Sequence, residues 1–112
     1  METARAMTEI IAGKMGLDIL LLDLSKITII ADYFIIATGE SERQLSAMAQ
    51  EVVEKTREQH SLKPLAVEGT PESGWILIDY GAIVVHLFSE AQRDRYQLEK
   101  FWSEARTVVR MA

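Results

Sequence analysis

The 112-residue sequence contains no cysteine. Disulfide bonds, thiolate catalysis and cysteine-based zinc sites are therefore excluded, and a reducing compartment is compatible with the composition. The sequence also lacks any apolar run near the roughly 18 residues of a membrane-spanning helix, and its first residues are too polar for a signal peptide. We expect a cytoplasmic protein that makes no membrane contact.

Positive charge is also scarce. Twelve Lys and Arg stand against 17 Asp and Glu, which gives a formal net charge of −5 at pH 7. This sign opposes tight contact with nucleic-acid phosphates, so we expect little direct nucleic-acid binding. A basic protein partner is compatible with the charge.

The remaining composition, 48% hydrophobic and 26% charged, is that of an ordinary globular protein. The length predicts a single domain over residues 1–112. No repeat, linker or low-complexity segment interrupts it, and residues 103–112 could form a frayed tail.

The hydrophobic pattern predicts an alternation of helices and strands. A stripe of Ala4, Met7, Ile11 and Met15 indicates a first helix that Gly16 could end in a left-handed cap. Predicted helices cover 3–15, about 41–60 and 89–102, and predicted strands cover 18–25, 32–39, 63–69 and the two halves of 75–88. The order α-β-β-α-β-β-β-α indicates an α/β sandwich with a mixed sheet.

Local signals mark several boundaries of these elements. Ser41 with Gln44, and Ser89 with Gln92, have capping-box spacing at the second and third helix starts. Pro64 favours an edge position for the strand at 63–69. Beyond Ser89 we expect helix contacts from Leu98, Phe101 and Trp102.

The stretch "WILIDYGAIVVHLF", residues 75–88, reads as a β-hairpin. With Tyr80 and Gly81 as its loop, Asp79 pairs with Ala82 and Trp75 with His86. Side-chain alternation then gives two faces. One face is aliphatic and should pack against helices: Ile76, Ile78, Ile83, Val85 and Leu87. The other is mixed and should be half exposed: Trp75, Leu77, Asp79, Ala82, Val84, His86 and Phe88.

The residues of this hairpin give little support for a catalytic role. Asp79 and His86 lie at opposite ends of the predicted ladder, about 10 Å apart, so they do not pair directly. A hydrogen-bonded structural or interface histidine is favoured for His86 over acid–base or metal chemistry. His60 supplies no second ligand at metal-binding spacing. Trp75 could anchor a protein interface, or could simply pack under the preceding loop.

Two further patterns give little support for an anion site or a metal site. The segment "ATGESE", residues 37–42, resembles a phosphate-binding turn. Glu40 and Glu42 would repel an anion there, so a helix cap is favoured. The scattered carboxylates do not give the paired pattern of a two-metal site. We expect no metal and no cofactor.

Two longer stretches carry a resemblance to a known family. "ADYFIIATGESERQ" and "VEGTPESGWILIDYGAIVVHLFSEAQRDRYQLEKFW" closely resemble the Iojap family, the ribosomal silencing factors, with D-Y-F-x-I-x-[ST]-G-x-S-x-R-Q and W-x-x-x-D-x-G-x-x-x-V-H-x-F patterns. The resemblance spans nearly residues 5–102. Ala82 is a departure, since family members usually have an acid there.

The resemblance implies a function in translation. It implies a non-enzymatic protein, with a fold related to nucleotidyltransferases, that binds protein L-fourteen of the large ribosomal subunit and sterically blocks joining of the small subunit. Translation would then be repressed, for example in starvation. A possible homodimer is also implied. The alternative is a nucleotidyltransferase-related enzyme or nucleotide-binding domain.

Matching positions give the expected partner-binding residues. Trp75, Leu77, Asp79 and Tyr80 form the main contact set. Four residues are expected as weaker members or supports: His86, Arg93, Tyr96 and Glu99.

Overall fold

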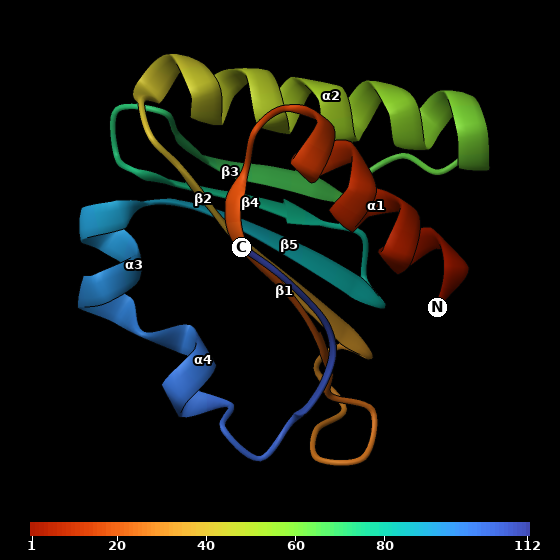
Figure 1. Cartoon of the computed structure of the whole chain (residues 1–112). Helices are drawn as coiled ribbons and strands as arrows, with labels where there is room; N and C mark the ends of the chain where they lie inside the picture. The colour runs from red at the N-terminus through yellow and green to blue at the C-terminus, as the bar shows by residue number, and fades with distance from the viewer.

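The computed structural model describes the whole chain as one six-stranded sheet with helices on both faces (Figure 1). The elements are α1 (Glu2–Gly13), β1 (Leu17–Asp23), β2 (Tyr33–Gly39), α2 (Glu42–His60), β3 (Ala66–Thr70), β4 (Trp75–Asp79), β5 (Ile83–Ser89), α3 (Glu90–Tyr96), α4 (Leu98–Phe101) and β6 (Arg106–Met111). The predicted α/β class with a mixed sheet is confirmed.

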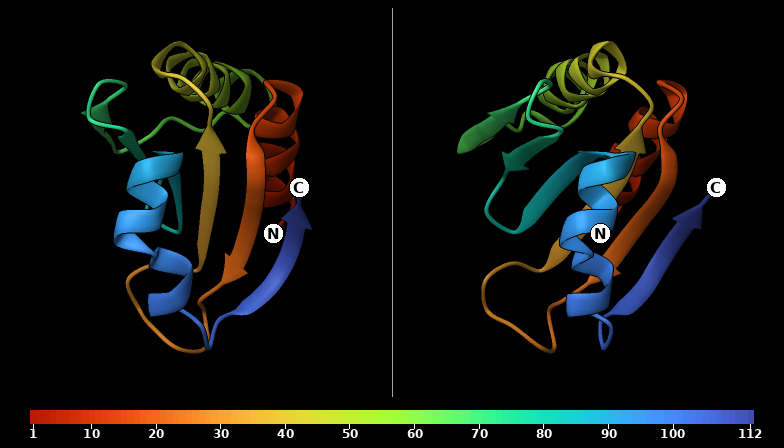
Figure 2. Two further views of the ribbon diagram at one scale, coloured as in Figure 1. Left: turned by 60° about the vertical axis from the view of Figure 1, so that its left-hand side comes forward. Right: turned by 90° about the vertical axis from the view of Figure 1, so that its left-hand side faces the viewer.

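The strands lie in the order β3-β4-β5-β2-β1-β6. The pair β2 and β5 is parallel and the other pairs are antiparallel. The strand β3 lies at one edge, as the nearby Pro64 predicts. Figure 2 shows α1 and α2 on one side of the sheet and α3 and α4 on the other.

The aliphatic face of the hairpin lies in the larger core, beneath α1 and α2. All five predicted residues, Ile76, Ile78, Ile83, Val85 and Leu87, are buried there. They pack against apolar side chains of α1 and α2, which include Met7, Ile11, Leu45, Met48 and Val52. This part of the prediction is confirmed, because a strict two-residue alternation decides which side chains enter the core.

The hairpin register differs from the prediction by two residues. The Tyr80 N–H donates to the Ile83 carbonyl at 2.8 Å, so Gly81 and Ala82 are the loop residues. Gly81, with φ of +85°, takes the first loop position, where a type II′ turn favours glycine. Asp79 therefore pairs with Val84 and Trp75 with Phe88. Because the shift is even, every side chain keeps its predicted face.

The second face of the sheet is covered more than predicted. Val84, His86 and Phe88 are buried in a smaller core under α3 and α4, to which Leu98 and Trp102 add partly buried contacts. Residues Trp75, Leu77 and Asp79 on β4 are half-buried. The expected half-exposed face is thus confirmed for β4 and wrong for β5.

The first helix ends differently from the prediction. It stops at Gly13, and Met15, rather than Gly16, has the left-handed backbone with φ of 66°. A Cβ on Gly16 would lie 2.5 Å from Cγ2 of Ile11. Gly16 is therefore needed for close packing, and Met15 is exposed instead of continuing the apolar stripe.

The predicted third helix is broken into two. Gln97 has a left-handed backbone, with φ of 49°, and separates α3 from α4. Both serine caps are confirmed: Ser41 accepts from the Gln44 N–H at 3.1 Å and Ser89 from the Gln92 N–H at 3.2 Å. Phe101 is exposed, which makes its predicted packing role wrong.

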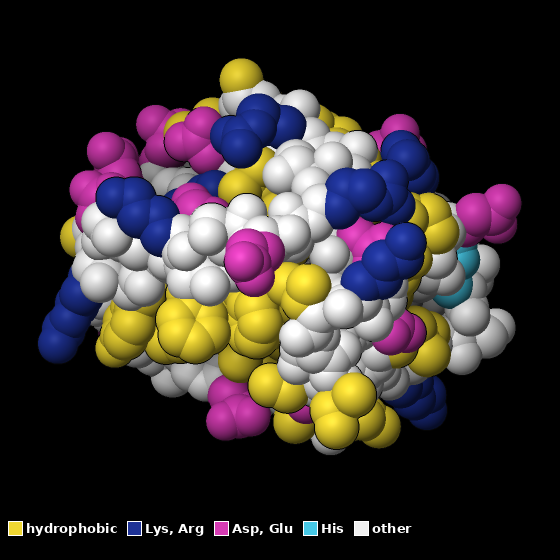
Figure 3. Space-filling model, turned by 90° about the horizontal axis from the view of Figure 1, so that it is seen from below, with side chains coloured by type: hydrophobic (Ala, Val, Ile, Leu, Met, Phe, Trp, Pro, Cys, Tyr) yellow, Lys and Arg dark blue, Asp and Glu magenta, His cyan; other side chains and the backbone are white.

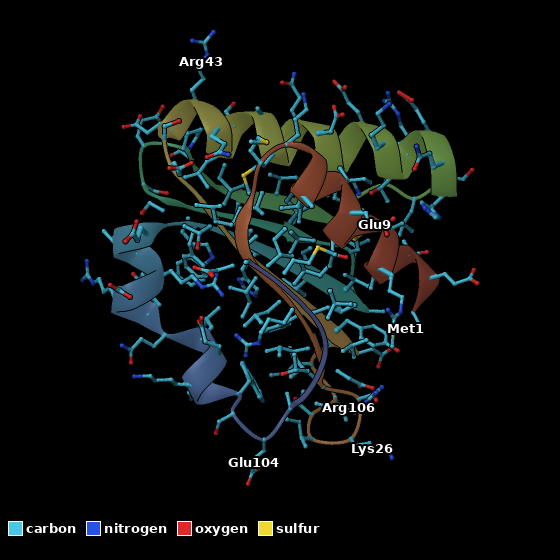
Figure 4. The ribbon with its side chains drawn as sticks, viewed as in Figure 1. Met1, Glu9, Lys26, Arg43, Glu104 and Arg106 are labelled. Carbon is cyan, nitrogen blue, oxygen red and sulfur yellow. The ribbon has the colours of Figure 1, made fainter.

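Residues 103–112 do not form a frayed tail. Residues 106–111 form β6, which pairs with β1 and contributes Val108, Val109 and Met111 to the larger core. Arg106 also donates to Asp23 at 3.2 Å, at the lower end of the sheet (Figure 4). This Asp23 carboxylate accepts from the Ser25 hydroxyl and N–H, and these bonds lower the pKa of Asp23.

Candidate partner-binding site

An aromatic group is assembled around Trp75, at the start of β4. The Trp75 ring lies 4.6 Å from the Tyr96 ring of α3 and 4.9 Å from the Phe88 ring of β5, measured between centroids. Phe88 is fully buried, whereas Tyr96 is 45% exposed. The group therefore runs from the smaller core out to the surface, and Trp75 lies between the two.

His86 supports this group from inside. The Trp75 Nε1–H donates to His86 Nδ1 at 3.2 Å, so the neutral imidazole carries its proton on Nε2. The Phe34 ring centroid lies 4.6 Å from that of His86, and Nε2 is buried without a hydrogen-bond partner. Burial lowers the pKa of His86 to about 4. The residue is a neutral hydrogen-bond acceptor that fixes the indole.

Leu77 and Asp79 share the open part of the second face with Trp75. The helices α3 and α4 lie over β5 and β2. Tyr96 of α3 contacts Trp75, and all three β4 side chains stay half-buried, beside the exposed edge strand β3. In the ladder, Leu77 lies between His86 on β5 and Glu68 on β3. This places an apolar side chain beside an exposed acid on an edge strand.

Asp79 has a structural use in the hairpin. Its Oδ1 accepts the Gly81 N–H at 2.7 Å, an Asx-type bond that stabilises the loop. The neighbouring Ala82 is exposed, and its carbonyl accepts the N–H groups of Asp32 and Tyr33. These are backbone contacts that do not depend on the side chain at 82.

Tyr80 does not lie on the open surface. It is 8% exposed and packs in the larger core, on the opposite face from Trp75, because it is one residue beyond Asp79 in the alternation. Burial raises the pKa of its phenol. The expected role of Tyr80 as a main contact residue is contradicted by this position.

Arg93 and Glu99 tie α3 and α4 to the sheet. Arg93 Nε donates to Glu99 Oε2 at 2.9 Å, and its Nη1 donates to Thr38 Oγ1 at 2.9 Å and to the Asp18 carbonyl. The Arg93 side chain is only 11% exposed. The two residues are supports of the aromatic group, which depends on the position of α3.

Comparisons with known proteins place this chain in a family. A family model described as "Ribosomal silencing factor during starvation" matches residues 1–111. The chain belongs to the RsfS family of ribosomal silencing factors.

Relatives of this RsfS-family chain come from bacteria and organelles. The ribosomal silencing factor RsfS of Bacillus subtilis is 40% identical over 92 residues, which cover 82% of this chain and 77% of that protein. A mouse protein, "Mitochondrial assembly of ribosomal large subunit protein 1", is 36% identical over 74 residues, 64% of this chain and 32% of its own length. A crystal structure of a Chromobacterium violaceum protein superposes with a TM-score of 0.86 at 36% identity, covering 91% of this chain and 84% of the other.

The structure places three further residues beside Trp75 that the sequence did not indicate. Glu68, Ser73 and Gln92 line a hollow of about 290 Å³ together with Trp75, Leu77 and Tyr96. Glu68 could have been found from its pairing with Leu77. That pairing depends on the register of the turn between β3 and β4, which the sequence does not fix. In the sequence, Gln92 was recognised only as the partner of Ser89 in a predicted capping box.

A second surface feature lies on the underside of the molecule. Exposed hydrophobic side chains gather there from the loop between β1 and β2 and from α4: Ile27, Ile29, Ile30 and Phe101. Figure 3 shows hydrophobic side chains across this underside.

The structure has neither a metal-binding cluster nor a membrane-spanning helix. No group of three or more His, Asp or Glu side chains could hold a metal ion. None of the helices has the length and hydropathy needed to cross a bilayer.

Proposed function

We propose that this protein binds the large ribosomal subunit through protein L-fourteen, blocks joining of the small subunit and so represses translation, as in starvation. Family membership supports the silencing role, and the name of the mouse relative points to the large subunit. The proposed contact surface is the open part of the second face around Trp75 and Leu77. We further propose that the protein is not an enzyme and acts in the cytoplasm.

The single observation that carries the contact surface is the placement of Trp75. Its indole is held by His86 and by two aromatic rings, yet the residue remains half-buried rather than sealed. A fixed aromatic side chain loses little conformational entropy on binding, and tryptophan is enriched among residues that dominate interface energies. A rigid domain bound at this surface needs only occupancy to block a second subunit.

Sedimentation through a sucrose gradient with purified subunits tests the proposal. We expect the protein to travel with the large subunit and not with the small one, and to reduce subunit joining when it is added first. Trp75→Ala should weaken large-subunit binding by roughly tenfold to a hundredfold.

Phe101→Ala is the matched control, since it removes an exposed aromatic ring from the underside instead. Circular dichroism and thermal melting confirm that each variant is folded. A folded Trp75→Ala protein that binds as well as the control contradicts the anchor role. Travel with the small subunit alone, or with neither, contradicts the proposed function.

The same open surface could also pair two copies of the chain. We propose such a homodimer as a competitor for the ribosome, because both partners would cover Trp75. Light scattering at increasing protein concentration, with and without isolated L-fourteen, tests whether the two assemblies exclude each other.

A further inference from the structure

We propose that the hollow between β3, β4 and α3 receives one long cationic side chain, a lysine or an arginine, from a basic protein segment. The inference rests on the proposed function, and it adds which chemistry the contact surface recognises. The hollow is lined by Trp75, Leu77, Tyr96 and Glu68, with Ser73 and Gln92 at its side.

The size and walls of the hollow suit a single side chain. Its volume of about 290 Å³ lies just below the roughly 300–1,000 Å³ of small-molecule pockets. Leu77 and the Trp75 ring offer apolar surface for an aliphatic stem, which lysine and arginine bury while keeping the charged end near water. A tryptophan ring is also the best aromatic partner for a cation.

The charge of the hollow selects a cation. Glu68 is exposed on the edge strand β3 and pairs with Leu77, so its carboxylate lies on the same face as the Trp75 and Leu77 side chains. No salt bridge in the structure neutralises Glu68, since the ion pairs are Arg93–Glu99 and Arg106–Asp23. The acid is therefore available to an incoming positive charge.

Gln92 supplies an unused acceptor. Its Nε2 donates to the Ser73 carbonyl at 3.3 Å, while its buried Oε1 accepts no hydrogen bond. Buried acceptors without partners are costly. A turn of the Gln92 side chain toward the hollow would let this oxygen accept from an ammonium or guanidinium group and would relieve the cost. The Tyr96 ring already has Arg95 5.6 Å from its centroid, so Trp75, Glu68 and Gln92 carry the recognition.

The negative charge continues beyond the hollow. A second hollow of about 360 Å³ shares Ser73 and Gln92 with the first and is lined by Glu40, Glu42 and Glu72. A partner segment that places one cation beside Trp75 would thus meet further carboxylates along its path. Such a surface fits a basic protein and repels the phosphates of RNA.

Charge reversal at Glu68 tests the inference. The dissociation constant would be measured by biolayer interferometry against isolated protein L-fourteen and against purified large subunits. Glu68→Gln should weaken binding roughly twofold to fivefold, and Glu68→Lys by about tenfold or more, because it places like charges together. The control is Glu58→Lys, which makes the same change in net charge at an exposed position near the end of α2.

The outcomes separate this inference from the proposed function. If the wild-type protein binds neither L-fourteen nor large subunits, the proposed function fails and this inference fails with it. If the wild type binds but Glu68→Lys behaves like Glu58→Lys, only the cation site is wrong. Tighter binding of Glu68→Lys to large subunits would show that the hollow faces RNA, which also overturns the inference.

Discussion

At the scale of single residues, the polar groups of the hairpin have structural roles in place of catalytic ones. His86 and Asp79 are each committed to one internal hydrogen bond, to the Trp75 indole and to the Gly81 N–H. Neither is placed as an acid or base in a pair. Their contribution to binding is indirect, because they fix the loop and the aromatic ring that the partner would meet.

The burial of His86 predicts a loss of stability in acid. Its pKa is about 4 in the folded protein, against an ordinary 6.5, so the unfolded chain takes up this proton first as the pH falls. The contribution of neutral His86 to stability is therefore present above pH 6.5 and is lost as the pH falls from 6.5 to about 4. At about 1.36 kcal/mol for each pKa unit, the loss reaches about 3 kcal/mol.

Urea unfolding at pH 7 and pH 4.5 measures this effect. His86→Gln keeps a hydrogen-bond acceptor near Trp75 but cannot be protonated, so its stability should depend less on pH than that of the wild type. His60→Gln, at the exposed end of α2, serves as the control and should keep the wild-type dependence. An identical pH dependence of all three proteins would rule out a buried neutral His86.

At the scale of elements, the C-terminal segment has the largest structural effect that sequence reasoning missed. The helices α3 and α4 cover the second face, and the chain then returns to form β6 against β1. Without β6, the backbone of β1 would be an unpaired sheet edge. The last strand is therefore part of the fold.

A charge introduced into β6 should destabilise the protein. Val109 pairs with Leu21 and packs against the larger core, so Val109→Asp should lower the free energy of unfolding by about 1–3 kcal/mol. Thr107→Asp, exposed in the same strand, is the control and should have little effect. Denaturant melts measure both, and equal small changes would mean that β6 adds nothing to stability.

At the scale of the whole molecule, the charge balance favours fast encounter with a basic surface. A net charge of −5 attracts a positive partner over distances set by the Debye length, roughly 30 Å at 0.01 M salt and 10 Å at 0.1 M. The acids around the hollow add a local component to this attraction.

Salt should therefore act mainly on the rate of association. We expect the association rate constant with isolated L-fourteen to fall several-fold between low and physiological salt, and the dissociation rate constant to change less. Surface plasmon resonance across a salt series measures both rates. An association rate that rises with salt would contradict an acidic contact surface.

The sequence by itself determined most of the elements, the larger core and the family resemblance. Alternation in the hairpin fixed which face Ile76 and Trp75 occupy, and this survived a register error because the shift was even. The serine caps could also be predicted from the sequence, because capping is a contact between residues three apart in the chain.

Only the tertiary structure decided what covers each face. Tyr80 is buried, β5 lies under α3 and α4, and the hollow at Glu68 and Gln92 appears only when β3 and α3 meet beside Trp75. Gln92 is separated in the chain from Glu68 and Trp75 by the whole of β5, and no local pattern reports that it becomes their neighbour. Local chemistry therefore specified the parts of this site, and long-range packing specified the site itself.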